Sequence, residues 1–208
     1  MRRFRKTIED FIYHTLIYSI PLEIKLPYLR VEIPEPNVMI KIREEQLQDI
    51  KAIREVNIRA FGQNQEADIV DKLRQNCNEL MSLVAIILNQ IVGHILFSPV
   101  KIESEDRTIR GMALAPMAVL PKYQRQGIGS ELIRTGIVRL KSKGCPFIIV
   151  LGHAEYYPRF GFKPASGYGI RSEWDVPDDA FMILVLNESE IRGSAGVARY
   201  RPEFAEGM

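Results

Sequence analysis

A short apolar run that leads through a glycine-containing loop into a helix constrains this fold more than any other feature. Residues 112–120, MALAPMAVL, predict a strand, the loop QRQGIG covers 124–129, and apolar residues recur at helical spacing over 132–140. Gly144 is the expected end of that helix. The other predicted strands are short apolar runs at 38–42, 80–88, 91–97, 147–151 and 181–186.

The order of these elements predicts the fold class. Asn89 and Gln90 separate two apolar strands as a tight turn, so those strands form a hairpin. A strand, a helix and a further strand follow the hairpin. This order predicts an α/β (α+β) fold with a mixed, mostly antiparallel central sheet flanked by helices. Two earlier helices are expected around 47–56 and 69–73, where apolar residues also recur at helical spacing.

The first 36 residues differ from the rest of the chain. Apolar residues over 7–20 follow a helical spacing that a proline ends, and the connector after it is rich in proline. We expect an N-terminal amphipathic helix and Pro-rich connector at 1–36, and one domain at 37–208. The helix is expected to pack on this domain or on a second subunit, as in a homodimer. Its acidic residues and short apolar face make a membrane-surface role the weaker alternative.

Composition excludes several classes of protein. A formal net charge of +2 over 208 residues gives no electrostatic case for a nucleic-acid partner. Cys77 and Cys145 are the two cysteines, and their separation gives neither a disulfide framework nor a cysteine metal site. A reducing, cytoplasmic setting is therefore expected, without a metal cofactor. Cys145, beside a proline at the head of a strand, is expected to pack in the core.

The glycine loop has the composition of a phosphate-binding turn. Glycines that open a helix expose backbone N–H groups at its positive end, where the dipole favours an anion. Gly127 and Gly129 allow close approach, and Arg125 adds charge. A dinucleotide fingerprint would need a glycine at Leu132, and a Walker A loop would need Gly-Lys-Ser/Thr. From the glycines alone, a simple tight turn between strand and helix remains an equal alternative.

Proline within the preceding strand favours the binding interpretation. Pro116 donates no hydrogen bond to a sheet, so it indicates an edge or a bulge. A disturbed strand that runs into a phosphate-binding loop leaves backbone groups free for another partner. Such a slot suits a linear ligand that contains amide groups.

Two segments carry a family resemblance. AVLPKYQRQGIGSELI resembles the signature of the GCN5-related N-acetyltransferase (GNAT) superfamily, with Gln124, Gly127 and Gly129 at its motif positions. AEYYPRFGF, residues 154–162, is similar to the second recurrent element of that superfamily. The resemblance covers about residues 38–187 and extends to a subgroup of small uncharacterised bacterial acetyltransferases. It implies the acyl-CoA N-acyltransferase fold and acetyl-CoA as co-substrate.

The resemblance also implies roles for individual residues. The pyrophosphate of coenzyme A would contact the backbone of the loop and helix start, which comprise Gln124, Arg125, Gln126, Gly127, Ile128, Gly129 and Ser130. The pantetheine arm would pair with Met117, Ala118 and Val119. The N–H of Ala118 would polarise the thioester carbonyl. Tyr157, at the tyrosine position of the second element, would protonate the departing thiolate, although packing beside aromatic neighbours is its alternative role.

The general base stays open. Several superfamily members carry a glutamate on the strand before the loop, but residues 110–120 contain no carboxylate. His153 and Glu155 lie near Tyr157 in sequence, His94 is a weaker candidate, and a chain of waters is a further alternative. Trp174 lies in a polar loop and is a candidate for an acceptor pocket.

The expected function is transfer of acetyl from acetyl-CoA to a primary amine by direct attack, without an acyl-enzyme. The alternatives are a coenzyme A-binding module without catalysis and an acetyltransferase that modifies proteins or peptides. The missing strand carboxylate keeps the non-catalytic alternative open. The acceptor is therefore expected to be a small molecule or a peptide amine.

Overall fold

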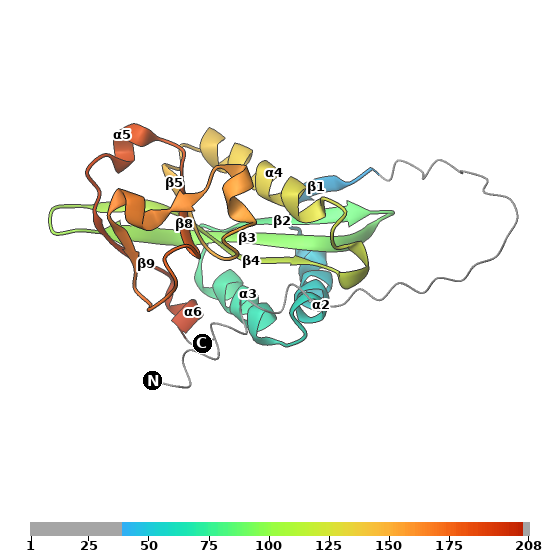
Figure 1. The fold of residues 1–208 in the computed structure, drawn as a ribbon. Coiled ribbons are helices and arrows are strands. Elements are labelled where there is room, and N and C mark those ends of the chain that lie inside the picture. Colours follow the sequence, from blue (N-terminus) through green and yellow to red (C-terminus); the bar gives the residue numbers. More distant parts are fainter. Residues whose placement is uncertain (1–38, 206–208) are drawn as a thin grey trace, which may run out of the picture.

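The computed structural model describes residues 39–205, which form one mixed sheet covered by helices on both faces (Figure 1). The expected N-terminal helix over 7–20, its connector and the proposed boundary at residue 36 lie outside the described residues. The helices are α2 (Ile50–Phe61), α3 (Gln65–Asn76), α4 (Ile128–Ser142), α5 (Glu188–Ile191) and α6 (Pro202–Ala205).

The strands are β1 (Lys41–Glu44), β2 (Met81–Ile87), β3 (Gln90–Glu103), β4 (Thr108–Val119), β5 (Phe147–Leu151), β6 (Lys163–Pro164), β7 (Ile170–Ser172), β8 (Phe181–Val185) and β9 (Gly196–Arg199). Their order across the sheet is β1-β2-β3-β4-β5-β8-β6, and β9 pairs with β3 and β7. Within this described part, β4 with β5 and β7 with β9 are the parallel pairs, and the other pairs are antiparallel. The mixed, mostly antiparallel sheet predicted from sequence is confirmed.

Helices cover the two faces of the sheet through different sets of apolar residues. Figure 1 shows α4 on one face and α2 with α3 on the other. Alternate β3 residues pack against the helices on the two faces, because successive side chains of a strand point to opposite faces. Phe97 lies under α4, where a methyl group on Gly136 would come within 2.4 Å of its ring. Leu96 instead joins the cluster formed by Ile53 and Leu73 of α2 and α3.

The central strands are longer than their apolar runs predicted. β3 was expected to end at residue 97, but it continues to Glu103 and pairs with β4 as far as Thr108. Pro99 is tolerated there because β2 begins at Met81, opposite Phe97, so no β2 residue lies beside it. The short strands β6, β7 and β9 were not predicted, since two to four residues carry no measurable periodicity.

Candidate active site

β4 and β5 separate halfway along β4 and leave a gap in the sheet. β5 pairs with β4 at Met112, Ala113 and Leu114, and no described strand continues that pairing along the rest of β4. At the same place Ile95 lies opposite Met117 while Phe97 lies opposite Leu114. β4 therefore carries two residues against one of β3, which is a bulge. The bulge predicted from Pro116 is confirmed.

The register beyond the bulge decides which backbone groups face this gap. Leu120 N–H donates to Val92 O at 2.9 Å, so that pair is hydrogen-bonded. Antiparallel pairs alternate between bonded and non-bonded. Ala118, opposite His94, consequently turns its N–H toward β3, whereas Met117 and Val119 turn theirs toward the gap. The expectation that the N–H of Ala118 faces a ligand is therefore wrong. The N–H groups that face the gap are those of its two neighbours, Met117 and Val119.

The loop after β4 adopts a backbone that only a few residue types favour. Arg125 has φ 61° and Gly127 has φ 84°, both in the left-handed region. Gly127 is the residue that caps α4, and no side chain accepts a hydrogen bond there. The Gln124 side chain donates to Val119 O at 3.0 Å, and the Gln126 side chain donates to Lys122 O at 3.0 Å. The side-chain amides of these two glutamines thus hold the loop.

The start of α4 presents a set of unused N–H groups. Within residues 39–205, no hydrogen bond uses the backbone N–H of Gln126, Gly127, Ile128, Gly129 or Ser130. The first residue of α4 itself is buried and fixes the helix end against the core. An uncapped helix N-terminus of this kind binds anions through its N–H groups and its dipole. It lies directly after the unpaired part of β4.

Tyr157 lies where β5 leaves β4. A methyl group on Gly152, the residue after β5, would come within 2.3 Å of its ring. The side chain is 7% exposed and stacks edge-on against Phe162 at 5.7 Å between ring centroids. Burial raises the pKa of the Tyr157 phenol above its ordinary value, so the group stays protonated near neutral pH. Its hydroxyl has no hydrogen-bond partner among the described residues.

Tyr156 is a site residue that the sequence reasoning missed. A methyl group on Gly129 would lie 3.0 Å from the Tyr156 hydroxyl and 3.5 Å from the Met117 sulfur. The guanidinium of Arg159 lies 3.8 Å from the centroid of the Tyr156 ring. Tyr156 therefore covers the α4 N-terminus, while Tyr157 packs beside Gly152, directly after β5. The doubled tyrosine in AEYYPRFGF was the available signal.

His94, one of the candidates for the general base, lies in the protein core. It is fully buried; Asn57 Nδ2 lies 3.1 Å from its Nδ1, and Ser82 Oγ lies 3.0 Å from its Nε2. Asn57 Nδ2 is a donor, so the histidine proton is on Nε2. Burial, together with the charge of Arg74, lowers the pKa of His94 to about 3. A histidine that resists protonation so strongly is a poor base.

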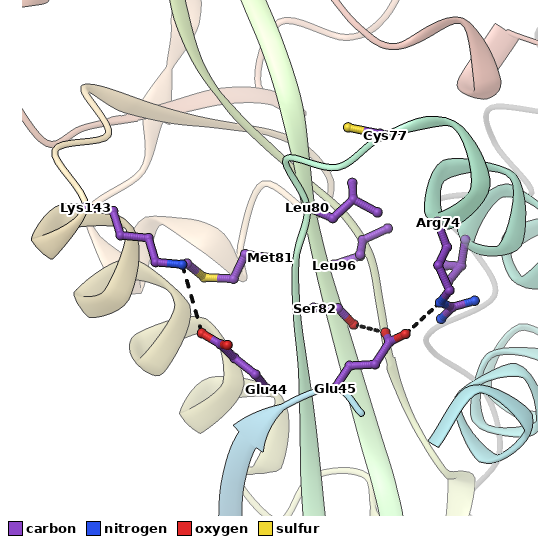
Figure 2. Close-up of a pocket in the computed structure, with 10 residues that line it drawn as sticks. Glu44, Glu45, Arg74, Cys77, Leu80, Met81, Ser82, Leu96 and Lys143 are labelled. Atoms are coloured by element: carbon purple, nitrogen blue, oxygen red, sulfur yellow. Dashed lines mark hydrogen bonds and ion pairs between the residues drawn. The ribbon is translucent and has the colours of Figure 1, made fainter. Parts of the chain in front are cut away.

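The hydrogen bonds of His94 continue into a cavity of about 260 Å³ beside the end of β1 (Figure 2). Ser82 donates to Glu45, and Arg74 Nε donates to the other oxygen of that carboxylate at 2.6 Å. Across the cavity, Lys143 Nζ lies 4.0 Å from Glu44. Because Ser82 directs its proton to Glu45, and His94 donates to Ser82, the serine is not an activated nucleophile. This network joins α3 to β2.

The other sequence candidates lie at different places. His153, half-buried in the turn after β5, has its pKa lowered by burial, and Glu155 is exposed. Trp174 packs 4.6 Å from the Tyr200 ring centroid and belongs, with Ala115, to the apolar cluster under α2 and α3. Cys145 is half-buried against the core, as expected, and its thiol donates to Phe147 O at 3.1 Å.

No group of three or more histidine, cysteine, aspartate or glutamate side chains in 39–205 is placed to hold a metal ion. None of the helices in that range is long and apolar enough to cross a membrane. The open strand edge and the uncapped helix N-terminus together suit a linear ligand that carries a phosphate group.

Comparison with known proteins gives the family. Residues 41–165 match the family model of the acetyltransferase (GNAT) domain. The uncharacterized N-acetyltransferase YjhQ of Escherichia coli K12 is 43% identical over 134 residues, which are 63% of this chain and 74% of YjhQ. YhbS of the same strain is 32% identical over 147 residues, which are 70% of this chain and 87% of YhbS. The chain belongs to the GNAT acetyltransferase family.

Solved structures agree with this assignment. The crystal structure of YhbS from Escherichia coli in complex with CoA superposes on this chain with a TM-score of 0.76 at 29% identity. The match covers 82% of this chain and 94% of the YhbS chain. A GNAT family acetyltransferase from Brucella melitensis in complex with acetyl-CoA has a TM-score of 0.64 at 34% identity, and covers 80% and 98%. The resemblance seen in the two sequence motifs is therefore confirmed.

Proposed function

We propose that this chain binds acetyl-CoA at the β4–α4 junction and transfers the acetyl group to a primary amine. The observation that carries the proposal is the set of five unused N–H groups, Gln126 to Ser130, directly beyond the unpaired edge of β4. The helix N-terminus suits the pyrophosphate, and the strand edge suits the amide-containing pantetheine arm. Binding of CoA by YhbS and of acetyl-CoA by the Brucella protein supports this assignment.

The chemistry follows from groups that face the gap. The neutral amine attacks the thioester carbonyl carbon, and the N–H of Met117 or Val119 stabilises the oxyanion that forms. Collapse of this intermediate breaks the carbon–sulfur bond and expels the coenzyme A thiolate. Tyr157 donates its proton to that thiolate, and solvent returns a proton to the phenolate, which burial disfavours. The amine loses its own protons to His153, Glu155 or water, and no residue is assigned to that step.

The proposal separates the roles of the two adjacent tyrosines. Tyr157→Phe removes the proton donor but keeps the ring in its apolar site, so kcat should fall roughly 10²-fold with little change in acetyl-CoA affinity. Tyr156→Phe removes a hydroxyl beside the α4 N-terminus. It should raise KM for acetyl-CoA and leave kcat within about twofold, which makes it the matched control. A near wild-type kcat for Tyr157→Phe would assign that proton transfer to water.

The experiment that tests the function is a thiol-release assay with acetyl-CoA and a panel of small amines and lysine peptides. Release that depends on a small amine supports small-molecule acetylation, and release with peptides alone identifies a peptide acetyltransferase. Calorimetric binding of acetyl-CoA without release for any acceptor would favour the non-catalytic binding module. No binding of acetyl-CoA at all would refute the assignment of the β4–α4 junction.

A further inference from the structure

Three basic side chains form a row across three neighbouring strands, far from the β4–α4 junction. Lys101 of β3 lies directly opposite Arg110 of β4 on one side and Arg199 of β9 on the other. Residues directly opposite in antiparallel strands share a face of the sheet. All three side chains are exposed, and the alternate residues Ile102 and Ile109 are buried in the core. The row therefore occupies a solvent-facing surface of the sheet.

Like charges placed directly opposite each other destabilise a sheet, so the row needs compensation. Arg199 has two long ion pairs, 3.6 Å to a Glu103 oxygen and 3.6 Å to a Glu173 oxygen. Neither Lys101 nor Arg110 lies within 4.0 Å of a carboxylate oxygen in the part of the chain that the structure describes. Two of the three charges consequently have no acidic partner there.

The row lies in a cleft of about 870 Å³. Two more cations line this cleft, but both lie near carboxylates: Lys143 Nζ is 4.0 Å from Glu44, and Arg201 pairs with Glu203 at 2.7 Å. Glu79 and Glu103 also line the cleft. Apolar side chains line the rest, among them Leu80, Met81, Pro99, Met112, Leu140 and Pro146. The cleft thus combines the two cations of the row that have no acidic partner, Lys101 and Arg110, with apolar surface, and this combination suits an anionic ligand with apolar parts.

The cleft is separate from the proposed cofactor site. It borders the residues after the C-terminal end of α4, whereas the glycine loop precedes its N-terminal end, about 22 Å away for a helix of this length. The negative end of the α4 dipole is masked locally, because the N–H groups of Gly144 and Cys145 bond to Lys141 O and Leu140 O. The end of α4 therefore does not neutralise Lys101 and Arg110, the two cations of the row without an acidic partner.

We propose that this cleft binds an acidic peptide segment of a partner protein. Neighbouring strands lie about 4.8 Å apart, so the row spans about 10 Å. One carboxylate or phosphate cannot reach across that distance, but an extended peptide carries side chains of one face about 7 Å apart and can pair two carboxylates with the row. Peptide side chains also supply the apolar contacts that an inorganic polyanion lacks. This proposal does not depend on the acetyl-transfer reaction.

The test is calorimetric titration of the full chain with a blocked hexaglutamate peptide at low salt, with hexaglutamine as the uncharged control. The variant Lys101→Ala/Arg110→Ala should lose at least tenfold in affinity. Lys41→Ala/Lys51→Ala, which removes the same charge from exposed positions outside the cleft, should change affinity less than twofold. The first double variant should also melt at or above the wild-type temperature, because it relieves repulsion.

Several results would overturn the proposal. Equal losses in the two double variants would mean that the peptide senses overall charge and not this row. Absence of hexaglutamate binding, or equal binding of hexaglutamine, would exclude an acidic peptide. If hexaglutamate does not bind, tripolyphosphate that binds the wild type but not Lys101→Ala/Arg110→Ala would identify a small polyanion site instead. Acetyl-CoA affinity should be unchanged in both double variants, so this outcome is separable from the assignment of the β4–α4 junction.

Discussion

The buried histidine of β3 makes a measurable prediction about stability and pH. His94 is held neutral between Asn57 and Ser82, with its pKa lowered to about 3 by burial and by Arg74. In the unfolded chain its pKa is about 6.5. Between these two values the unfolded state binds a proton that the folded state does not. Stability should therefore be fully present above pH 6.5 and fall as the pH is lowered toward 3.

The size of this effect follows from proton linkage. Below pH 6.5 the slope approaches about 1.4 kcal/mol per pH unit for one such group. Integrated from pH 7 to pH 5, the loss from His94 alone is about 2 kcal/mol. That is a large part of the stability of an ordinary domain. Other titrating groups contribute over the same range, so a difference between two proteins is needed.

The measurement compares the wild type with His94→Gln by urea unfolding at pH 7 and pH 5. Glutamine keeps a donor and an acceptor but does not titrate, so the variant should be less stable at pH 7 yet lose about 2 kcal/mol less on acidification. His153→Gln is the matched control, because His153 is only half-buried. It should follow the wild-type curve more closely. Parallel losses in the wild type and His94→Gln would refute the reasoning that His94 is neutral and buried.

Three more outcomes are expected. Gly127→Val should weaken acetyl-CoA binding at least tenfold, or about 1.4 kcal/mol by calorimetry, because valine rarely adopts φ 84° and blocks the loop; Gly144→Val, equally strained at φ 76° but at the other end of α4, should leave affinity unchanged. Gly136→Ala should cost about 1–3 kcal/mol in urea unfolding, because its methyl group would come within 2.4 Å of Phe97, and Phe97→Leu should restore part of the loss; unchanged stability would contradict that packing. A chain without residues 1–36 should keep wild-type affinity for acetyl-CoA, and loss of binding by the folded fragment would place the domain boundary elsewhere.

Local sequence signals predicted the part of the site that depends on the backbone conformation of single residues. Pro116 predicted a disturbed strand and the glycines predicted a bare helix start, because proline and glycine each fix what the backbone can do at their own position. The second family motif then added Tyr157, but not Tyr156. None of these signals needed information about distant residues.

What the sequence did not predict depends on pairing between distant segments. The direction of the Ala118 N–H follows from the register with β3, and a strand pattern alone does not contain that register. The environment of His94 depends on Asn57 and Ser82, which are distant in sequence. The basic row could not be predicted from sequence either, because Lys101, Arg110 and Arg199 become neighbours only in the folded sheet.

The gap between β4 and β5 also bears on the risk of aggregation. Free N–H and C=O groups along a strand are a template on which another chain can add, and exposed templates of this kind promote aggregation. Here the unpaired stretch runs only from Ala115 to Val119, between the bulge and the turn that begins at Pro121. Pro116 removes one donor from it. The open edge is therefore long enough for a narrow linear ligand but too short for stable pairing with a strand of another chain.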